Sequence, residues 1–187
     1  MTISIVYHSV YGHTAKLAQA VAKGAQINED TTVHLISVDD TQIKWDLLEK
    51  SDAIIFGSPT YNGTISSGLK KFFEDSTKAA WLEFKWRNKI AAGFTNSGAF
   101  SGDKLNSLIT IALFAAQHGM IWTGLDLHPA NEKNNVPTKN LNRLGSWLGS
   151  MAQSDDDSPE VTPGKDDLDT AQYLGKRVAE ITKQFIR

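Results

Sequence analysis

Apolar runs and amphipathic stretches alternate along this chain of 187 residues. Five runs predict β-strands, because each is short and mostly apolar. They lie at residues 3–7, 32–38, 52–58, 89–95 and 120–125. The third run, DAIIFGS, is apolar almost throughout, which is typical of a strand that is buried on both faces of a sheet.

Helical patterns separate these strands. We expect helices at residues 14–26, 67–77, 103–118 and 168–186, and a short helical stretch at 45–48. Strands that alternate with helices indicate βαβ units around a parallel sheet. With five strands, the doubly wound order 2-1-3-4-5 is the natural topology.

One long segment interrupts this alternation. Residues 126–166 are rich in Asn, Pro, Gly, Ser and Asp, and a loop of this length in a compact domain is usually functional or disordered. We favour a functional flap, because GSWLGSM at 145–151 places apolar residues in its middle; the alternative is a mobile surface loop. Within it, the acidic run Asp155 to Asp157 is interpreted as a solvated loop tip. The chain length predicts a single domain over residues 1–187.

Composition narrows the possible functions. The chain has no cysteine, which excludes thiolate catalysis and thiolate-ligated metals, so redox chemistry would need a borrowed cofactor. The net charge of −2 comes with no basic cluster, which argues against nucleic acid as a partner. No apolar run approaches the roughly 20 residues of a membrane helix, and the N-terminus shows no signal-peptide pattern. We therefore expect a soluble, cytoplasmic protein without membrane insertion, and we predict no metal site.

The stretch SVYGHT, residues 9–14, follows the first predicted strand and opens the first predicted helix. Ser9 and Thr14 can donate hydroxyl hydrogen bonds, Gly12 permits close backbone approach, and the first helical amides attract an anion. The stretch therefore predicts a phosphate cradle, although it matches neither GxxxxGK[ST] nor GxGxxG. The alternative is that Ser9 and Thr14 merely cap the helix.

Two further loops are expected beside this cradle. In the order 2-1-3-4-5 the strand order reverses between strands one and three, so the loop SPTYNGTISSG at 58–68 borders the same crevice. Its Asn62–Gly63 pair is a strong turn signal. The loop TNSGAFSG at 95–102 follows the next strand of the sheet. Three such loops suit a large planar ligand with a phosphate tail.

These motifs, in this order and spacing, resemble the WrbA-like NAD(P)H:quinone oxidoreductases of the flavodoxin-like superfamily. The resemblance rests on YHSVYGHTAKLAQAV, DAIIFGSPTYNGTISSGLKKFF, TNSG and AQHGM, and it covers nearly the whole chain. It implies a flavodoxin-like three-layer α/β sandwich with a five-stranded parallel sheet in the order 2-1-3-4-5. It also implies FMN as cofactor, NADH or NADPH as electron donor and a small-molecule quinone as acceptor.

The resemblance further implies which residues form the site. In the family the first loop holds the FMN phosphate, the next two loops border the isoalloxazine ring, and a histidine lies near the flavin. A tryptophan lies near the substrate, and the tyrosine of the first loop is associated with the nicotinamide. By position, the substrate-binding residues here are Tyr11 and Trp81, and the cofactor-binding residues are Ser9, Val10, Tyr11, Gly12, His13, Thr14, Thr60, Tyr61, Asn62, Asn96, Ser97, Gly98, Ala99, Phe100, Ser101 and His118.

Three departures from the family pattern stand out. AFSGDK replaces a glycine-rich third loop, so Phe100 is expected to reshape the ring pocket. The stretch DDTQIKWDLLEKS between the second and third strands is short for the family, which leaves open whether the expected homo-oligomer is a dimer or a tetramer. The segment NRLGSWLGSM matches the family only loosely, so no residue role is transferred there.

Topology places two of these residues away from the crevice. His118 and Trp81 both precede predicted strands, so they belong at the amino edge of the sheet and cannot reach the flavin of their own chain. Their family roles therefore require a composite site between subunits. Alternatively, His118 simply ends a helix before Gly119, and Trp81 packs against Trp86 or Phe84.

The mechanism favoured by the resemblance is ping-pong: hydride passes from NAD(P)H to the flavin, and a quinone then takes two electrons. Backbone amides near Asn62 and Asn96 are candidates for stabilising reduced flavin, and no catalytic acid or base is assigned. One alternative is a flavodoxin-type FMN electron carrier without substrate turnover, which the nearly balanced charge disfavours modestly. Another is a regulatory protein that has lost the cofactor.

Overall fold

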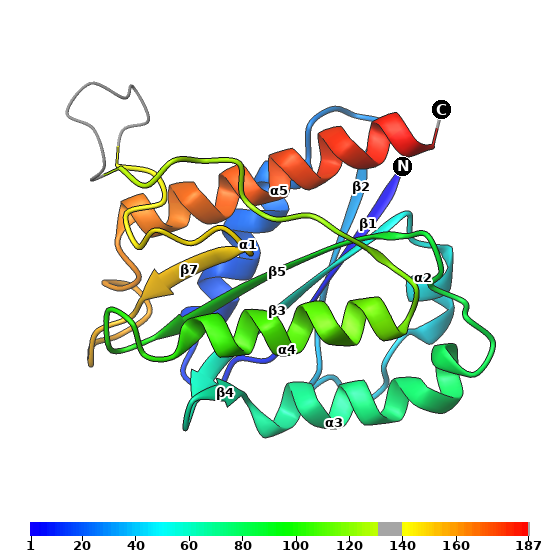
Figure 1. Ribbon diagram of the computed structural model, residues 1–187, viewed down its shortest axis with the longest axis horizontal. Helices are drawn as coiled ribbons and strands as arrows, with labels where there is room; N and C mark the ends of the chain where they lie inside the picture. The colour runs from blue at the N-terminus through cyan, green and yellow to red at the C-terminus, as the bar shows by residue number, and fades with distance from the viewer. Residues whose placement is uncertain (131–139, 187) are drawn as a thin grey trace.

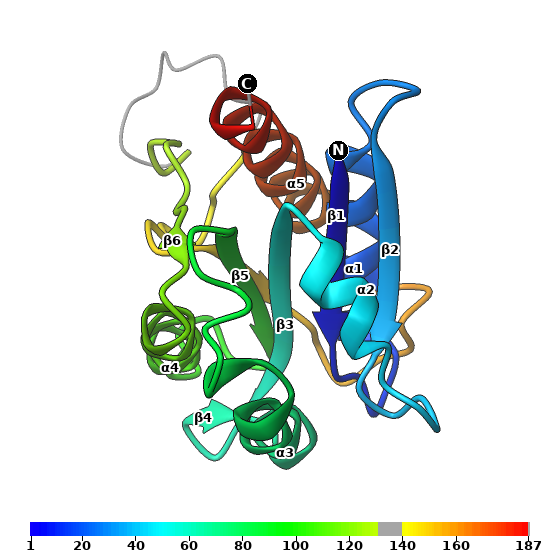
Figure 2. The same ribbon diagram turned by 90° about the vertical axis from the view of Figure 1, so that its right-hand side faces the viewer.

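The computed structural model describes residues 1–130 and 140–186. A parallel sheet forms its centre, in the strand order β2-β1-β3-β5-β6, with β7 also paired to β5 (Figures 1 and 2). A short strand, β4, pairs antiparallel with the end of β3. The strands are β1 (Thr2–Tyr7), β2 (Thr32–Ser37), β3 (Ala53–Tyr61), β4 (Thr64–Ile65), β5 (Ile90–Ser97), β6 (Ile121–Trp122) and β7 (Ser150–Gln153).

Helices cover both faces of this sheet, as Figures 1 and 2 show. Helices α1 and α5 pack on one face, while α2, α3 and α4 pack on the other. A single π-helical turn, Thr77–Trp81, extends α3. The predicted flavodoxin-like sandwich and the order 2-1-3-4-5 are thus confirmed. The helices are α1 (His13–Ala25), α2 (Trp45–Lys50), α3 (Ser67–Ser76), α4 (Lys104–Gln117) and α5 (Lys165–Phe185).

The central strands form because both of their faces are buried. In β3, all residues but the last are buried, as the continuous apolar run predicts. Alternate residues enter two separate cores: Ile55 faces the core under α1 and α5, and Phe56 faces the core under α2, α3 and α4.

The fifth strand position differs from the prediction. A continuous strand was expected at 120–125, but only β6 forms there, pairing with the first two residues of β5. The chain then leaves the sheet and returns as β7, which pairs with the last four residues of β5. The segment expected to be a loop at 126–166 therefore contains a strand, and α5 starts at Lys165 rather than at 168. Residues 131–139 of the expected flap lie outside the described residues.

Helices α1 and α5 approach one another closely because glycines lie at their crossing. A Cβ on Gly24 would lie 1.8 Å from the carbonyl oxygen of Gln172, and one on Gly175 would lie 2.0 Å from that of Val21. Neither helix, nor any other in the described parts of the chain, has the length and hydropathy needed to cross a bilayer.

Candidate active site

The three predicted loops meet at the carboxyl edge of the sheet and line one crevice. Its volume is about 580 Å³, which is within the usual range for sites of small molecules and cofactors. Seven predicted site residues line it, and a segment that the sequence did not point to lines it as well. The lining residues are Tyr11, His13, Thr60, Tyr61, Asn96, Ser97, Gly98, Ser154, Asp155, Asp156, Asp157, Ser158 and Pro159.

The first loop turns sharply into α1. Gly12 is the residue before the helix and has a φ of 93°, a left-handed conformation that favours glycine. Ser9 Oγ accepts a hydrogen bond from the backbone N–H of Ala15 at 3.1 Å. Ser9 therefore satisfies one of the free amides of α1, as the capping alternative predicts, while its hydroxyl proton remains available to a ligand.

Thr14 joins the first loop to the third. Its hydroxyl donates to Oδ1 of Asn96 at 2.7 Å, and Nδ2 of Asn96 donates to the hydroxyl of Ser154 at 3.0 Å. Thr14 is only 1% exposed. Because its single hydroxyl proton is used within the chain, Thr14 positions Asn96 rather than offering a free donor to a phosphate.

The second loop is a tight hairpin between β3 and β4. Asn62 and Gly63 both have positive φ values, 49° and 84°, as their turn signal predicts. The hydroxyl of Thr60 lies 2.8 Å from that of Thr95 and 2.7 Å from that of Ser107, which fixes the loop against β5 and α4.

Two tyrosines stand at this side of the crevice. Tyr61 is 38% exposed and Tyr11 is 69% exposed. Partial burial, together with the nearby Tyr11 phenol, raises the pKa of the Tyr61 phenol above its usual value. Both side chains therefore offer aromatic surface next to the space between the loops.

The third loop separates two cavities. Ser97 and Gly98 line the crevice, whereas Phe100 and Ser101 line a neighbouring cavity of about 700 Å³ that also touches Trp147. The Arg143 guanidinium lies 5.7 Å from the centroid of the Phe100 ring. Phe100 thus faces the segment that precedes β7.

The acidic segment lies against the first loop, although the sequence indicated only a solvated loop tip. Nε2 of His13 donates to the backbone oxygen of Asp157 at 2.8 Å, and Lys16 forms an ion pair with Glu160 at 2.9 Å. A Cβ on Gly12 would lie 2.7 Å from Cγ of Pro159. The aspartates at 155–157 are exposed, yet they border the crevice. The sequence did not predict this position because it did not predict β7. The carboxyl end of β7 lies at the crevice, and the acidic segment follows it directly.

His118 does not reach the crevice and is 2% exposed. Its ring packs at 4.5 Å from the rings of both Trp86 and Phe114, at the amino edge of the sheet. The Ser76 hydroxyl donates to the carbonyl of Phe73, so Nε2 of His118 must donate to Ser76 Oγ at 3.1 Å. Nδ1 then has no partner among the described residues. Burial lowers the pKa of His118 to about 4. His118 therefore lies apart from the crevice of its own chain, and its role as a cofactor-binding residue stays a prediction.

Trp81 also lies at the amino edge, as the topology predicts. Its indole N–H donates to the backbone oxygen of Gln117 at 3.0 Å, and its ring lies 6.4 Å from that of Phe84. The side chain is 40% exposed. The structure therefore separates Trp81 from the crevice of its own chain.

Several predicted residues belong to the three loops without lining the crevice. They are Ser9, Val10, Gly12, Thr14, Asn62 and Ala99. Within the described residues, no cluster of three or more His, Cys, Asp or Glu side chains is arranged to hold a metal ion. The chemistry that the crevice can support is recognition of an anion at the start of α1 and of a planar ring between Tyr61 and Gly98.

Comparisons with known proteins agree with this architecture. Residues 4–87 match the model of the family described as flavodoxin domain. Flavodoxin FldP of Pseudomonas aeruginosa is 39% identical over 185 residues, which cover 97% of this chain and 96% of that protein. An NAD(P)H dehydrogenase (quinone) of Archaeoglobus fulgidus is 34% identical over 207 residues, covering 98% of each chain.

Among solved structures, the crystal structure of a flavodoxin, WrbA-like protein from Agrobacterium tumefaciens is similar to this fold. Its TM-score is 0.75 at 37% sequence identity, and the match covers 98% of each chain. The similarity extends over nearly the whole length of both chains. The chain therefore belongs to the WrbA-like family of the flavodoxin-like superfamily.

Proposed function

We propose that the protein is an FMN-dependent oxidoreductase that passes two electrons from NAD(P)H to a quinone. The observation that carries this proposal is the meeting of three loops in one crevice, with the start of α1 at one end and aromatic side chains beside it. FMN has the matching shape, a planar ring with a phosphate tail.

The first loop would hold the phosphate. The opening amides of α1 have no partner within the helix, and the helix dipole adds a partial positive charge at the same point. Ser9 can donate its hydroxyl proton there, because its hydrogen bond with Ala15 uses only an acceptor position. Thr14 acts indirectly, by holding Asn96.

The second and third loops would hold the ring. Thr60 is buried and locked by its two hydroxyl partners, so the backbone next to Tyr61 is well fixed. Gly98 lines the opposite side without a side chain to obstruct close approach. Asn96 connects this side to Thr14, so the phosphate and ring ends of the site are mechanically coupled.

Bound FMN would supply the redox chemistry, accepting a hydride from NAD(P)H and passing two electrons to the quinone in a ping-pong order. The protein's share is binding, orientation and electrostatics. Tyr11 is the candidate surface on which the nicotinamide or the quinone stacks, because it is the more exposed of the two tyrosines. No side chain is assigned as catalytic acid or base.

The names of the relatives support this function, since several proteins that match nearly the whole chain are called NAD(P)H dehydrogenase (quinone). We place the protein in the cytoplasm, where NAD(P)H is available, and propose a homodimer or homotetramer. Trp81 keeps enough exposed surface to contact a second subunit, whereas His118 does not.

The test is steady-state oxidation of NADH and of NADPH by the FMN-loaded protein with benzoquinone, against free FMN at the same concentration. Turnover well above the free-flavin rate with either nucleotide supports the proposal. Tight FMN binding without turnover would instead assign an electron carrier. No FMN binding would leave the crevice without its proposed cofactor.

A further inference from the structure

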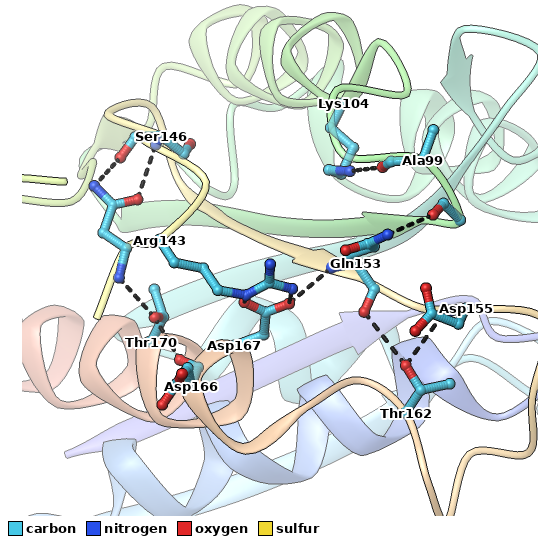
Figure 3. Close-up of polar contacts among 12 residues, drawn as sticks. Ala99, Lys104, Arg143, Ser146, Gln153, Asp155, Thr162, Asp166, Asp167 and Thr170 are labelled. Atoms are coloured by element: carbon cyan, nitrogen blue, oxygen red, sulfur yellow. Dashed lines mark hydrogen bonds and ion pairs between the residues drawn. The ribbon is translucent and has the colours of Figure 1, made fainter. Parts of the chain in front are cut away.

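A lysine is buried directly beneath the third loop. Lys104, the first residue of α4, is fully buried, and its ammonium donates to Ser97 Oγ at 2.9 Å. It also donates to the carbonyl oxygen of Ala99 at 2.6 Å, as Figure 3 shows. It forms no ion pair with a carboxylate within the described parts of the chain. A positive charge at the start of a helix is also disfavoured by the helix dipole.

The buried position of Lys104 is unfavourable for its positive charge. Burial lowers the pKa of its ammonium to about 8; Asp167 of α5 opposes this effect and Arg143 adds to it. The Asp167 carboxylate is already engaged, since it accepts two hydrogen bonds from Arg143 at 2.7 Å and one from the backbone N–H of Gln153 at 2.8 Å (Figure 3). Lys104 therefore keeps a positive charge that no neighbouring carboxylate neutralises directly.

Lys104 and Gln153 orient the third loop through its carbonyl groups. Nε2 of Gln153 donates to the carbonyl oxygen of Gly98 at 3.1 Å, and Lys104 binds that of Ala99. In a trans peptide the N–H points opposite to the C=O, so the N–H groups of Ala99 and Phe100 lie on the other side of the loop. Neither N–H donates a hydrogen bond to any described residue. The loop thus presents two free donors away from Lys104.

We propose that Lys104 is a positioning residue for the flavin reaction, which fixes the third loop beside the crevice through Ser97 and Ala99 and stabilises the negative charge of the ring upon reduction. This inference rests on the proposed function. A hydride brings two electrons and one proton, so the ring that accepts it gains one negative charge unless a further proton follows. Positive charge behind the loop stabilises the reduced cofactor more than the oxidised one.

A second lysine provides a matched control. Lys89 precedes β5 as Lys104 follows it, and its ammonium also donates to backbone carbonyls, those of Glu49 and Ser51. Burial lowers its pKa as well. Lys89 lies at the amino end of β5, away from the crevice, so its replacement removes a partly buried charge without touching the third loop.

The experiment measures FMN affinity and the two-electron reduction potential of bound FMN in the wild type and in the variants Lys104→Met, Lys104→Gln and Lys89→Met. Lys104→Met should weaken binding of reduced FMN relative to oxidised FMN by about tenfold, which equals a potential lower by about 30 mV. Lys104→Gln, which still has N–H donors, should lower the potential similarly. Lys89→Met should leave the potential unchanged even where it lowers the stability of the protein.

The outcomes separate this inference from the proposed function. If Lys104→Met binds FMN with the wild-type potential, the role of Lys104 is overturned while the flavoprotein assignment stands. If the wild type binds no FMN, both are overturned. If neither Lys104 variant folds, the wild-type potential is followed from about pH 6 to about pH 10: a change of slope near the pKa of Lys104 supports the role, and a single slope overturns it.

Discussion

The hydroxyl of Thr14 donates a hydrogen bond to Oδ1 of Asn96 at 2.7 Å, across 82 positions of the sequence. This bond connects the first loop to the strand that carries the third loop. This one hydrogen bond therefore fixes the two ends of the proposed cofactor site relative to one another, and it forms without a bound ligand.

Thr14→Val tests this connection. Because the bond is buried and Asn96 would lose its donor, we expect the variant to be about 1 kcal/mol less stable to unfolding and to bind FMN several-fold more weakly. Thr182→Val is the matched control, since Thr182 is a buried threonine that donates to Val178 within α5. The control should lose stability but keep its FMN affinity. Equal FMN affinity in Thr14→Val and the wild type, measured by fluorescence titration, would contradict the connection.

The acidic segment should weaken cofactor binding. Its carboxylates border the crevice that we expect to hold a phosphate, and like charges repel. Asp157→Asn should tighten FMN binding by up to about fivefold at low ionic strength, and the gain should shrink as salt is added. Asp46→Asn, an exposed aspartate in the first turn of α2, should have no effect. A salt-independent change in Asp157→Asn would assign the effect to loop structure instead.

His118 should make the fold sensitive to acid. Its pKa in the folded state is lowered to about 4, so between that value and 6.5 the unfolded chain binds more protons than the folded one. Stability is therefore complete above 6.5 and falls by up to about 1.4 kcal/mol per pH unit below it. His118→Phe keeps the packing between Trp86 and Phe114 without a titrating group, and its stability should depend less on pH over this range. Parallel curves for the two proteins in urea unfolding would contradict this.

The crossing of α1 and α5 should not tolerate a side chain. Gly24→Ala would place Cβ against the carbonyl oxygen of Gln172, so we expect a loss of about 1 to 3 kcal/mol in the free energy of unfolding. Gly164→Ala, at a position where a Cβ meets nothing within 4 Å, should change stability far less. Equal thermal midpoints for the two variants would contradict this, because they would show that α1 and α5 can move apart without loss of stability.

The layers, the strand order and the three loops could be predicted because they rest on local patterns and on general rules of parallel sheets. The order of apolar runs was enough to place His118 and Trp81 at the edge opposite the crevice. Strand β7 was not predictable in this way, because SMAQ is short and mixed, and only its pairing with β5 makes it a strand. The acidic segment was missed for the same reason, since tertiary contacts bring it to the first loop.

The most direct test of the central claim follows the two half-reactions separately without oxygen. Mixing FMN-loaded protein with NADH or NADPH should bleach the absorbance of the bound flavin, and benzoquinone added afterwards should restore it with one quinone consumed per flavin. Absorbance that is unchanged by both nucleotides, in protein that retains its FMN, would contradict the assignment as an NAD(P)H:quinone oxidoreductase.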